Sequence, residues 1–177
     1  GLGDVYKRQI LDINMGCPVP KVVNNGEGSA LLKNPNLIEE IVRKVSSAIS
    51  KPLTVKVRIG FENEPVDIVE IAKRIEDAGA AALAVHGRTR QQYYSGTADW
   101  DTIRRVKEAI TIPVIGNGDV DSPLKAEALV KQTGCDAVMV GRAVRGNPWL
   151  FRELNHYFRT GELLERPSVC LLYTSDA

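Results

Sequence analysis

The sequence lacks the features of exported, membrane-spanning or disulfide-bonded proteins. Its only three cysteines, Cys17, Cys135 and Cys170, have spacings that match neither a disulfide framework nor a zinc site. No apolar run approaches the roughly 20 residues that a membrane-spanning helix needs, and no basic-then-apolar leader opens the chain. We therefore expect a cytoplasmic protein that binds no metal.

A strong excess of charge is also missing. Lys and Arg number 23 against 22 Asp and Glu, so the overall charge neither requires nor excludes a nucleic-acid partner. The hydrophobic share of 44% is ordinary for one globular domain or part of one. Residues 1–9 and 168–177 have no structural pattern of their own, and we interpret them as a non-native leader and tail. Cys170 is set aside with them.

Five short apolar runs alternate with helical patterns. The predicted strands cover residues 10–14, 53–59, 82–86, 112–117 and 136–141. Between them, apolar residues recur with the 3.6-residue period of a helix, as in Ile38, Ile41, Val42, Val45 and Ile49. Ser122 followed by Pro123 predicts the start of a fourth helix, and Pro148 that of a fifth. Strands joined by crossover helices are parallel, so the chain is predicted to be an α/β protein.

A (β/α)8 barrel is the favoured architecture. No G-x-G-x-x-G sequence follows the first strand, which disfavours a dinucleotide-binding open sheet. Polar residues end all five apolar runs, whereas an open sheet gathers its site at one switch point. Since five strands cannot close a barrel, we predict an incomplete (β/α)8 TIM barrel with two open edges.

The polar residues at the strand ends are the strongest functional signal. The carboxyl ends of parallel barrel strands share one rim, so groups far apart in sequence converge there. In residues 53–59, alternation places Thr54, Lys56 and Arg58 on the interior face. The predicted rim consists of Asn14, Lys56, Arg58, His86, Asn117, Asp119 and Arg142.

Two glycine-rich loops follow the last two strands. Such loops let backbone N–H groups approach an anion, and barrels often hold phosphate at this position. Gly116, Gly118, Gly141 and Arg142 therefore predict a phosphate site. From these residues alone, the phosphate could belong to a sugar, a nucleotide or a flavin.

Cys17 and Cys135 are expected to have different roles. Cys135 precedes an apolar strand and is interpreted as core packing. Cys17 lies in a loop just past a strand end, between Gly16 and Pro18, where a thiol could serve as an acid or a nucleophile. His156 belongs to an amphipathic helical pattern and is interpreted as packing or surface.

Several motifs together resemble the tRNA-dihydrouridine synthase family, most closely its bacterial B-type branch. They are "DINMGCPVPKVVNNGEGSALLKNP", "TVKVRIG", "VHGRTR", "GNGDV", "MVGRAVRGNPWLF" and "HYFRTGELL". The resemblance extends from Ile10 to about Pro167. It implies an FMN-dependent oxidoreductase that reduces uridine to 5,6-dihydrouridine in tRNA, with NADPH as reductant.

The resemblance also implies residue roles. Cys17 matches the catalytic acid that protonates uracil C5 after hydride reaches C6, and Asn14 matches the asparagine near the uracil. Arg88 is expected to contact the tRNA substrate on the rim. The expected FMN ligands are Lys56, His86, Asn117, Gly118, Asp119, Gly141 and Arg142.

The resemblance further implies that the chain is an internal fragment. Residues 10–147 would be the partial FMN-binding barrel, about the last five βα units. Residues 148–167 would be the last barrel helix, leading to a helical tRNA-binding domain that is absent. Three alternatives stay open: a barrel resembling dihydroorotate dehydrogenase, an aldolase with Lys56 as Schiff-base nucleophile, and an inactive truncation.

Overall fold

A computed structural model describes residues 9–62 and 66–165. The interpretation of residues 1–9 and 168–177 as leader and tail falls, apart from residue 9, outside the described residues. Five parallel strands form one sheet in the order of the sequence, as predicted. They are β1 (Leu11–Met15), β2 (Leu53–Gly60), β3 (Ala82–Thr89), β4 (Val114–Asn117) and β5 (Ala137–Met139).

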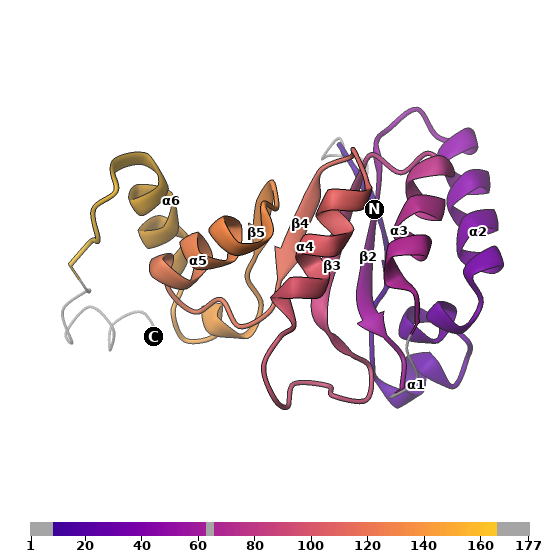
Figure 1. The fold of residues 1–177 in the computed structure, drawn as a ribbon, viewed down its shortest axis with the longest axis horizontal. Helices are drawn as coiled ribbons and strands as arrows, with labels where there is room; N and C mark the ends of the chain where they lie inside the picture. Colours follow the sequence, from indigo (N-terminus) through magenta and orange to yellow (C-terminus); the bar gives the residue numbers. More distant parts are fainter. Residues whose placement is uncertain (1–8, 63–65, 166–177) are drawn as a thin grey trace, which may run out of the picture.

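Helices follow the strands and cover one face of the sheet. Figure 1 shows α2, α3 and α4 side by side, with α5 and α6 continuing the row away from α2. The helices are α1 (Pro20–Val23), α2 (Pro35–Ala48), α3 (Ile68–Asp77), α4 (Trp100–Ala109), α5 (Pro123–Thr133) and α6 (Leu150–Thr160), with short 3-10 helices η1 (Gly28–Lys33) and η2 (Arg142–Val144). This arrangement confirms the incomplete (β/α)8 barrel. No helix within the described ranges is long and apolar enough to cross a membrane.

Local sequence chemistry sets the helix boundaries. The side chains of Asn34, Asp67, Asp99 and Ser122 accept hydrogen bonds from the first turns of α2, α3, α4 and α5. The predicted start of α5 at Ser122 and Pro123 is therefore confirmed. Helix α6 begins at Leu150, two residues after the predicted Pro148.

Successive side chains of β2 point alternately to the core between sheet and helices and to the barrel interior. Leu53, Val55 and Val57 are almost fully buried and belong to the core between sheet and helices. Thr54 and Lys56 lie on the opposite face, which is the barrel interior, and are only partly buried. Lys56 thus faces the interior, as predicted.

The strand register brings the polar strand ends together. Asn14 pairs with Lys56, Arg58 pairs with His86, and His86 pairs with Asn117. The register shifts between Arg58 and Gly60, where β2 and β3 run further than the predicted apolar segments. Residues as far apart in the sequence as Asn14 and Asn117 therefore share one rim.

Candidate active site

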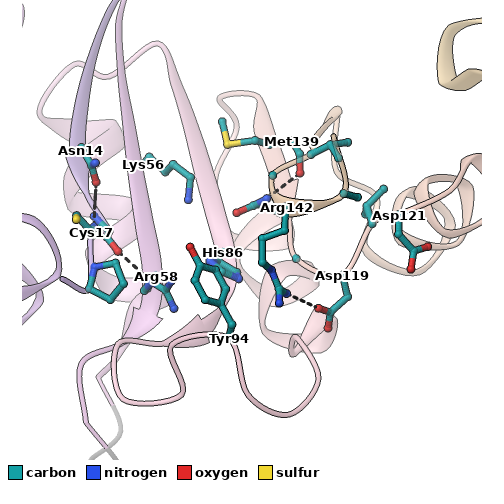
Figure 2. Close-up of a pocket in the computed structure, with 18 of the residues that line it drawn as sticks. Asn14, Cys17, Lys56, Arg58, His86, Tyr94, Asp119, Asp121, Met139 and Arg142 are labelled. Atoms are coloured by element: carbon teal, nitrogen blue, oxygen red, sulfur yellow. Dashed lines mark hydrogen bonds and ion pairs between the residues drawn. The ribbon is translucent and has the colours of Figure 1, made fainter. Parts of the chain in front are cut away.

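An open pocket of about 600 Å³ lies at the carboxyl ends of the strands. Every strand end contributes to it, and Figure 2 shows its side chains. Of the candidates predicted from sequence, the structure brings ten to the pocket: Asn14, Cys17, Lys56, Arg58, His86, Asn117, Gly118, Asp119, Gly141 and Arg142. Two other candidates, Gly116 and Arg88, are not among its lining residues.

The loop that carries Cys17 is held from both sides. The Asn14 Oδ1 atom accepts hydrogen bonds from the backbone N–H groups of Gly16 and Cys17, both at 3.0 Å. The Cys17 carbonyl accepts bonds from Ser29, from its amide at 3.0 Å and from its hydroxyl at 2.9 Å. Gly28 has a φ of +59°, and a Cβ there would lie 2.8 Å from the Cys17 carbonyl oxygen. The structure therefore gives Asn14 an orienting contact with the Cys17 loop.

Lys56 and His86 face the middle of the pocket, and the pKa of each is lowered. Burial lowers the pKa of Lys56 from 10.5 to about 8, assisted by the nearby positive charge of Arg58 and opposed by Asp12. Burial also lowers the pKa of His86 to about 3, with the cations of Arg58 and Lys56 acting in the same direction. His86 is consequently uncharged near neutral pH, while Lys56 titrates close to it.

The side of the pocket opposite the Cys17 loop is more open, and Asp119 is the residue that makes its polar contacts. Its carboxylate contacts Arg88 Nη2 at 2.6 Å and Arg142 Nη2 at 3.4 Å, and it accepts a bond from the Ala98 amide at 2.7 Å. Burial acts to raise the pKa of Asp119, but these hydrogen bonds and the two guanidinium groups outweigh it and hold the pKa below its ordinary value. Asp119 is therefore ionised and orients the exposed Arg142.

Asn117, Gly118 and Gly141 form the backbone of that wall. The Asn117 amide donates to the Met139 carbonyl at 2.7 Å, which joins the ends of β4 and β5. Gly118 has a φ of +133°, and a Cβ there would meet the Ala98 Cβ at 2.6 Å. At Gly141 a Cβ would meet nothing within 4 Å, so the backbone is open on that side.

Two sequence interpretations are revised by the packing. Arg88 is 1% exposed, and its guanidinium is directed to the Ser95 and Gly96 carbonyls and to Asp119 rather than to the pocket. Gly116, predicted at the phosphate site, faces α5 instead. A Cβ there would lie 3.0 Å from the Cys135 sulfur and 3.1 Å from the Leu129 side chain. Both residues support the site from behind.

Tyr94 lines the pocket and was missed by the sequence reasoning. It is 43% exposed, and the Arg142 guanidinium carbon lies 4.4 Å from its ring centroid. Its ring centroid is 6.5 Å from that of His86. The available signal was a pair of adjacent tyrosines in a polar loop directly after a strand.

The fold and pocket define a class of protein. An α/β barrel with convergent polar side chains at the carboxyl ends of its strands has the site location found in barrel enzymes. The described residues contain no cluster of three or more His, Cys, Asp or Glu that could hold a metal ion.

Comparison with known proteins gives the family. A sequence model described as Dihydrouridine synthase (Dus) matches residues 3–174, so the chain belongs to the dihydrouridine synthase family. It is 52% identical over 156 residues to the tRNA-dihydrouridine synthase B of Pseudomonas aeruginosa, covering 88% of this chain and 47% of that protein. The Pectobacterium carotovorum protein of the same name is also 52% identical over 156 residues, covering 88% of this chain and 49% of that protein.

The chain therefore spans about half the length of the curated relatives that it matches. Among solved structures, a chain in the crystal structure of the Amycolatopsis orientalis BexX/CysO complex is similar, with a TM-score of 0.52 and 21% identity. That likeness covers 94% of this chain and 64% of the other, and it concerns the fold alone.

Proposed function

We propose that this chain is the active-site portion of a tRNA-dihydrouridine synthase, an oxidoreductase that reduces the C5–C6 bond of a uridine in tRNA. The observation that carries the proposal is the fixed position of the Cys17 loop on the same rim as Lys56, His86 and the Asp119–Arg142 wall. Membership of the dihydrouridine synthase family supports it. The names of the relatives support tRNA as the partner and, with it, a cytoplasmic location.

The residues present fit FMN as the cofactor. The pocket volume of about 600 Å³ lies within the range of cofactor sites, which is about 300–1,000 Å³. Arg142 is an exposed cation beside the open backbone of Gly141, and such a pair suits a phosphate group. Asn117, Gly118 and Asp119 would hold the adjoining ribityl chain. Lys56 and His86 would face the ring.

Lys56 and His86 would then act in different ways. With its pKa near 8, Lys56 is largely protonated near neutral pH and can compensate negative charge on a bound ring. His86 remains uncharged, since its pKa is about 3, and can exchange a hydrogen bond without adding a third positive charge beside Lys56 and Arg58. FMN, when bound and reduced by NADPH, would supply the hydride for uracil C6.

Cys17 would supply the proton. Reduction at C6 leaves negative charge at C5, and a thiol held above that carbon can transfer its proton to it. Asn14 holds the Cys17 loop through two backbone hydrogen bonds, so the thiol's position is set before substrate binds. Asn14 would also lie near the uracil ring.

The remaining half of such an enzyme would complete the site. We infer that this chain is an internal fragment, with residues 10–147 as about the last five βα units of the barrel. Residues 148–167, including α6, would lead toward a helical tRNA-binding domain. Cofactor affinity and activity therefore belong to the complete parent enzyme.

The test is anaerobic reduction of unmodified tRNA by the purified parent enzyme with FMN and NADPH. Mass spectrometry of the digested tRNA should detect dihydrouridine, and the protein should carry a flavin absorbance spectrum. Folded, flavin-loaded enzyme that forms no dihydrouridine in any tRNA would overturn the proposal.

A lysine-dependent aldolase is the second candidate, because the pKa of Lys56, near 8, is the kind that favours Schiff-base formation. Borohydride treatment with a carbonyl substrate would leave a covalent adduct on Lys56 in that case. Flavin binding without such an adduct would exclude the aldolase.

A further inference from the structure

Arg58 is a buried cation held by backbone carbonyls. It is 3% exposed, and its Nε donates to the Gly16 carbonyl at 3.0 Å. Its Nη1 donates to the Thr89 and Tyr93 carbonyls, both at 2.9 Å. Within residues 9–62 and 66–165, Arg58 forms no salt bridge. Its contacts are therefore with loop backbones rather than with a carboxylate.

These contacts join two loops on different sides of the pocket. The first, residues 16–19, is the Cys17 loop, and Gly16 precedes the thiol directly. The second, residues 90–98, is the tyrosine loop, in which Tyr93 precedes the pocket residue Tyr94. Arg58 lies between them at the end of β2, and Figure 2 shows its side chain between Cys17 and Tyr94. The Arg58 guanidinium thus holds the backbone of Gly16, directly before Cys17, and that of Tyr93, directly before Tyr94.

Only a forked side chain can make this set of bonds. Arginine presents five N–H donors in a rigid plane, so separate edges can reach separate carbonyls. Lysine keeps the charge but presents its donors from one nitrogen on a flexible stem. Arg58→Lys should therefore keep the charge and lose the simultaneous hold on Gly16 and Tyr93.

Arg88 provides an internal comparison. It is also a buried arginine at a strand end, and it also holds the tyrosine loop, at the Ser95 carbonyl (3.0 Å) and the Gly96 carbonyl (2.6 Å). Its third partner is Asp119, on the far side of the pocket from Cys17. Arg88 thus holds the tyrosine loop without a hydrogen bond to the Cys17 loop.

We propose that Arg58 is a positioning residue that couples the Cys17 loop to the tyrosine loop, and so fixes the distance between the Cys17 thiol and the Tyr94 ring. The mechanical coupling depends only on the contacts described above. Its consequence for uridine reduction rests on the proposed function.

Hydrogen exchange on the 177-residue chain tests the coupling. The reporters are the amides of Gly16, Cys17 and Ser29 for the first loop, and those of Tyr93 and Ser95 for the second. Arg58→Lys should accelerate exchange in both loops by about 10- to 100-fold, the loss expected for a hydrogen bond to a charged group. Arg88→Lys, the matched control, should accelerate exchange in the tyrosine loop only. Unchanged exchange at Gly16 and Cys17 in Arg58→Lys, or equal acceleration there in Arg88→Lys, would overturn the proposal.

The wild-type chain gives a test that needs no variant. With increasing urea, the reporter amides of the two loops should open together in one local event if Arg58 couples them. Separate opening of the two loops would contradict the coupling, even if both arginine variants failed to fold.

In the parent enzyme, the catalytic consequence is a split between two half-reactions. Arg58→Lys should slow single-turnover uridine reduction at least about tenfold, since proton donation depends on thiol position. Flavin reduction by NADPH should stay within about threefold of wild type. An equal loss of rate in both half-reactions would show that Arg58 stabilises the fold and does not position the thiol. Altered exchange in a parent enzyme that forms no dihydrouridine would instead reject the proposed function and leave the coupling intact.

Discussion

The two ends of the barrel place charged side chains in different environments. At the carboxyl end, Lys56, Arg58 and His86 bring three basic side chains together, and burial lowers the pKa of each. At the amino end, charges meet partners. Glu76 accepts three hydrogen bonds from Thr111 and Ile112, and Asp136 contacts Lys107 Nζ and the Val114 amide, both at 2.7 Å.

The free-energy consequences of these environments differ in sign. Hydrogen bonds from the Thr111 side chain and from Lys107 hold the pKa values of Glu76 and Asp136 below their ordinary values, so ionisation there favours the folded state. The lowered pKa values of Lys56 and His86 mean that protonation at the rim opposes folding. The buried basic side chains of the rim therefore cost stability, whereas the paired Asp119 on the rim and the paired carboxylates at the amino end contribute it.

The largest expected effect sharpens this comparison at the rim. In the parent enzyme, Cys17→Ala should slow uridine reduction by about 10²–10⁴-fold, because a positioned acid contributes about that factor. The NADPH half-reaction does not involve the proton at C5 and should stay within a few-fold of wild type. Single-turnover reduction of tRNA by prereduced enzyme measures the first, and anaerobic stopped-flow measures the second. Unchanged uridine reduction would remove Cys17 from the mechanism.

Cys135→Ala is the matched control for Cys17. Cys135 is 3% exposed and packs beside Gly116 behind the rim. Its replacement should lower the free energy of unfolding by about 1 kcal/mol through lost packing, while the folded enzyme keeps its rate of uridine reduction. A large rate loss here would show that the assay reports packing rather than proton donation.

The second prediction concerns His86 and acid stability. The folded chain protonates His86 only near pH 3, whereas the unfolded chain does so near 6.5, so acid favours unfolding across that interval. His86→Asn should therefore reduce the stability lost between about pH 7 and 4.5 by about 2–3 kcal/mol, since each pH unit below 6.5 contributes about 1.4 kcal/mol. Urea unfolding at several pH values measures this difference. His156→Asn removes the other histidine, which lies on α6 outside the pocket lining, and an equal change of slope there would show that the effect is not specific to His86.

The third prediction concerns Lys56, where removing a charge should stabilise the fold. Below pH 8 the folded chain holds a proton on Lys56 less favourably than the unfolded chain does. Lys56→Met should raise the free energy of unfolding by about 1–2 kcal/mol near neutral pH, after allowance for partial solvent contact. The gain should vanish above about pH 10.5, where neither state carries the charge.

Lys56→Met should at the same time weaken FMN binding by the parent enzyme, about tenfold, because a charge facing the ring is lost. Lys125 also lines the pocket but is solvent-exposed and pairs with Asp121 at 2.7 Å. Lys125→Met should alter the free energy of unfolding by less than about 1 kcal/mol. Equal stabilisation by both variants would show that burial of Lys56 is not the cause.

The rim could be predicted from the sequence because each of its residues is recognisable within its own short strand segment. Each apolar strand ends in a polar residue, and parallel strands must align those ends, so Asn14, Lys56, His86 and Asn117 converged as expected. Helix starts such as Ser122 were predictable for the same reason, since the capping residue lies within the segment that it caps.

What the sequence did not predict depends on contacts between distant loops. The burial of Arg88 requires carbonyls of Ser95 and Gly96 and the carboxylate of Asp119 to surround it, and no short pattern encodes that arrangement. The α1 helix has four residues, fewer than the two turns needed to display a helical period. Tyr94 lines the pocket in a loop that Arg58 and Arg88 hold by hydrogen bonds to its backbone carbonyls, and these contacts are not visible in the local sequence.

The smallest expected effect tests the amino end. Glu76→Gln keeps one oxygen acceptor but removes the charge that strengthens the bonds from Thr111 and Ile112 at 2.6–3.0 Å. The free energy of unfolding should fall by about 1 kcal/mol near neutral pH, a modest value because the carboxylate is partly solvated. The hydrogen bond from the Thr111 hydroxyl lowers the pKa of Glu76 below 4.5, so this contribution exists above that pH and disappears as pH falls through the lowered value.

The acid-stability difference produced by His86→Asn should persist unchanged in the Glu76→Gln background, since the two residues lie at opposite ends of the barrel. Non-additive free energies in that double-mutant cycle would mean that the two ends do not function separately.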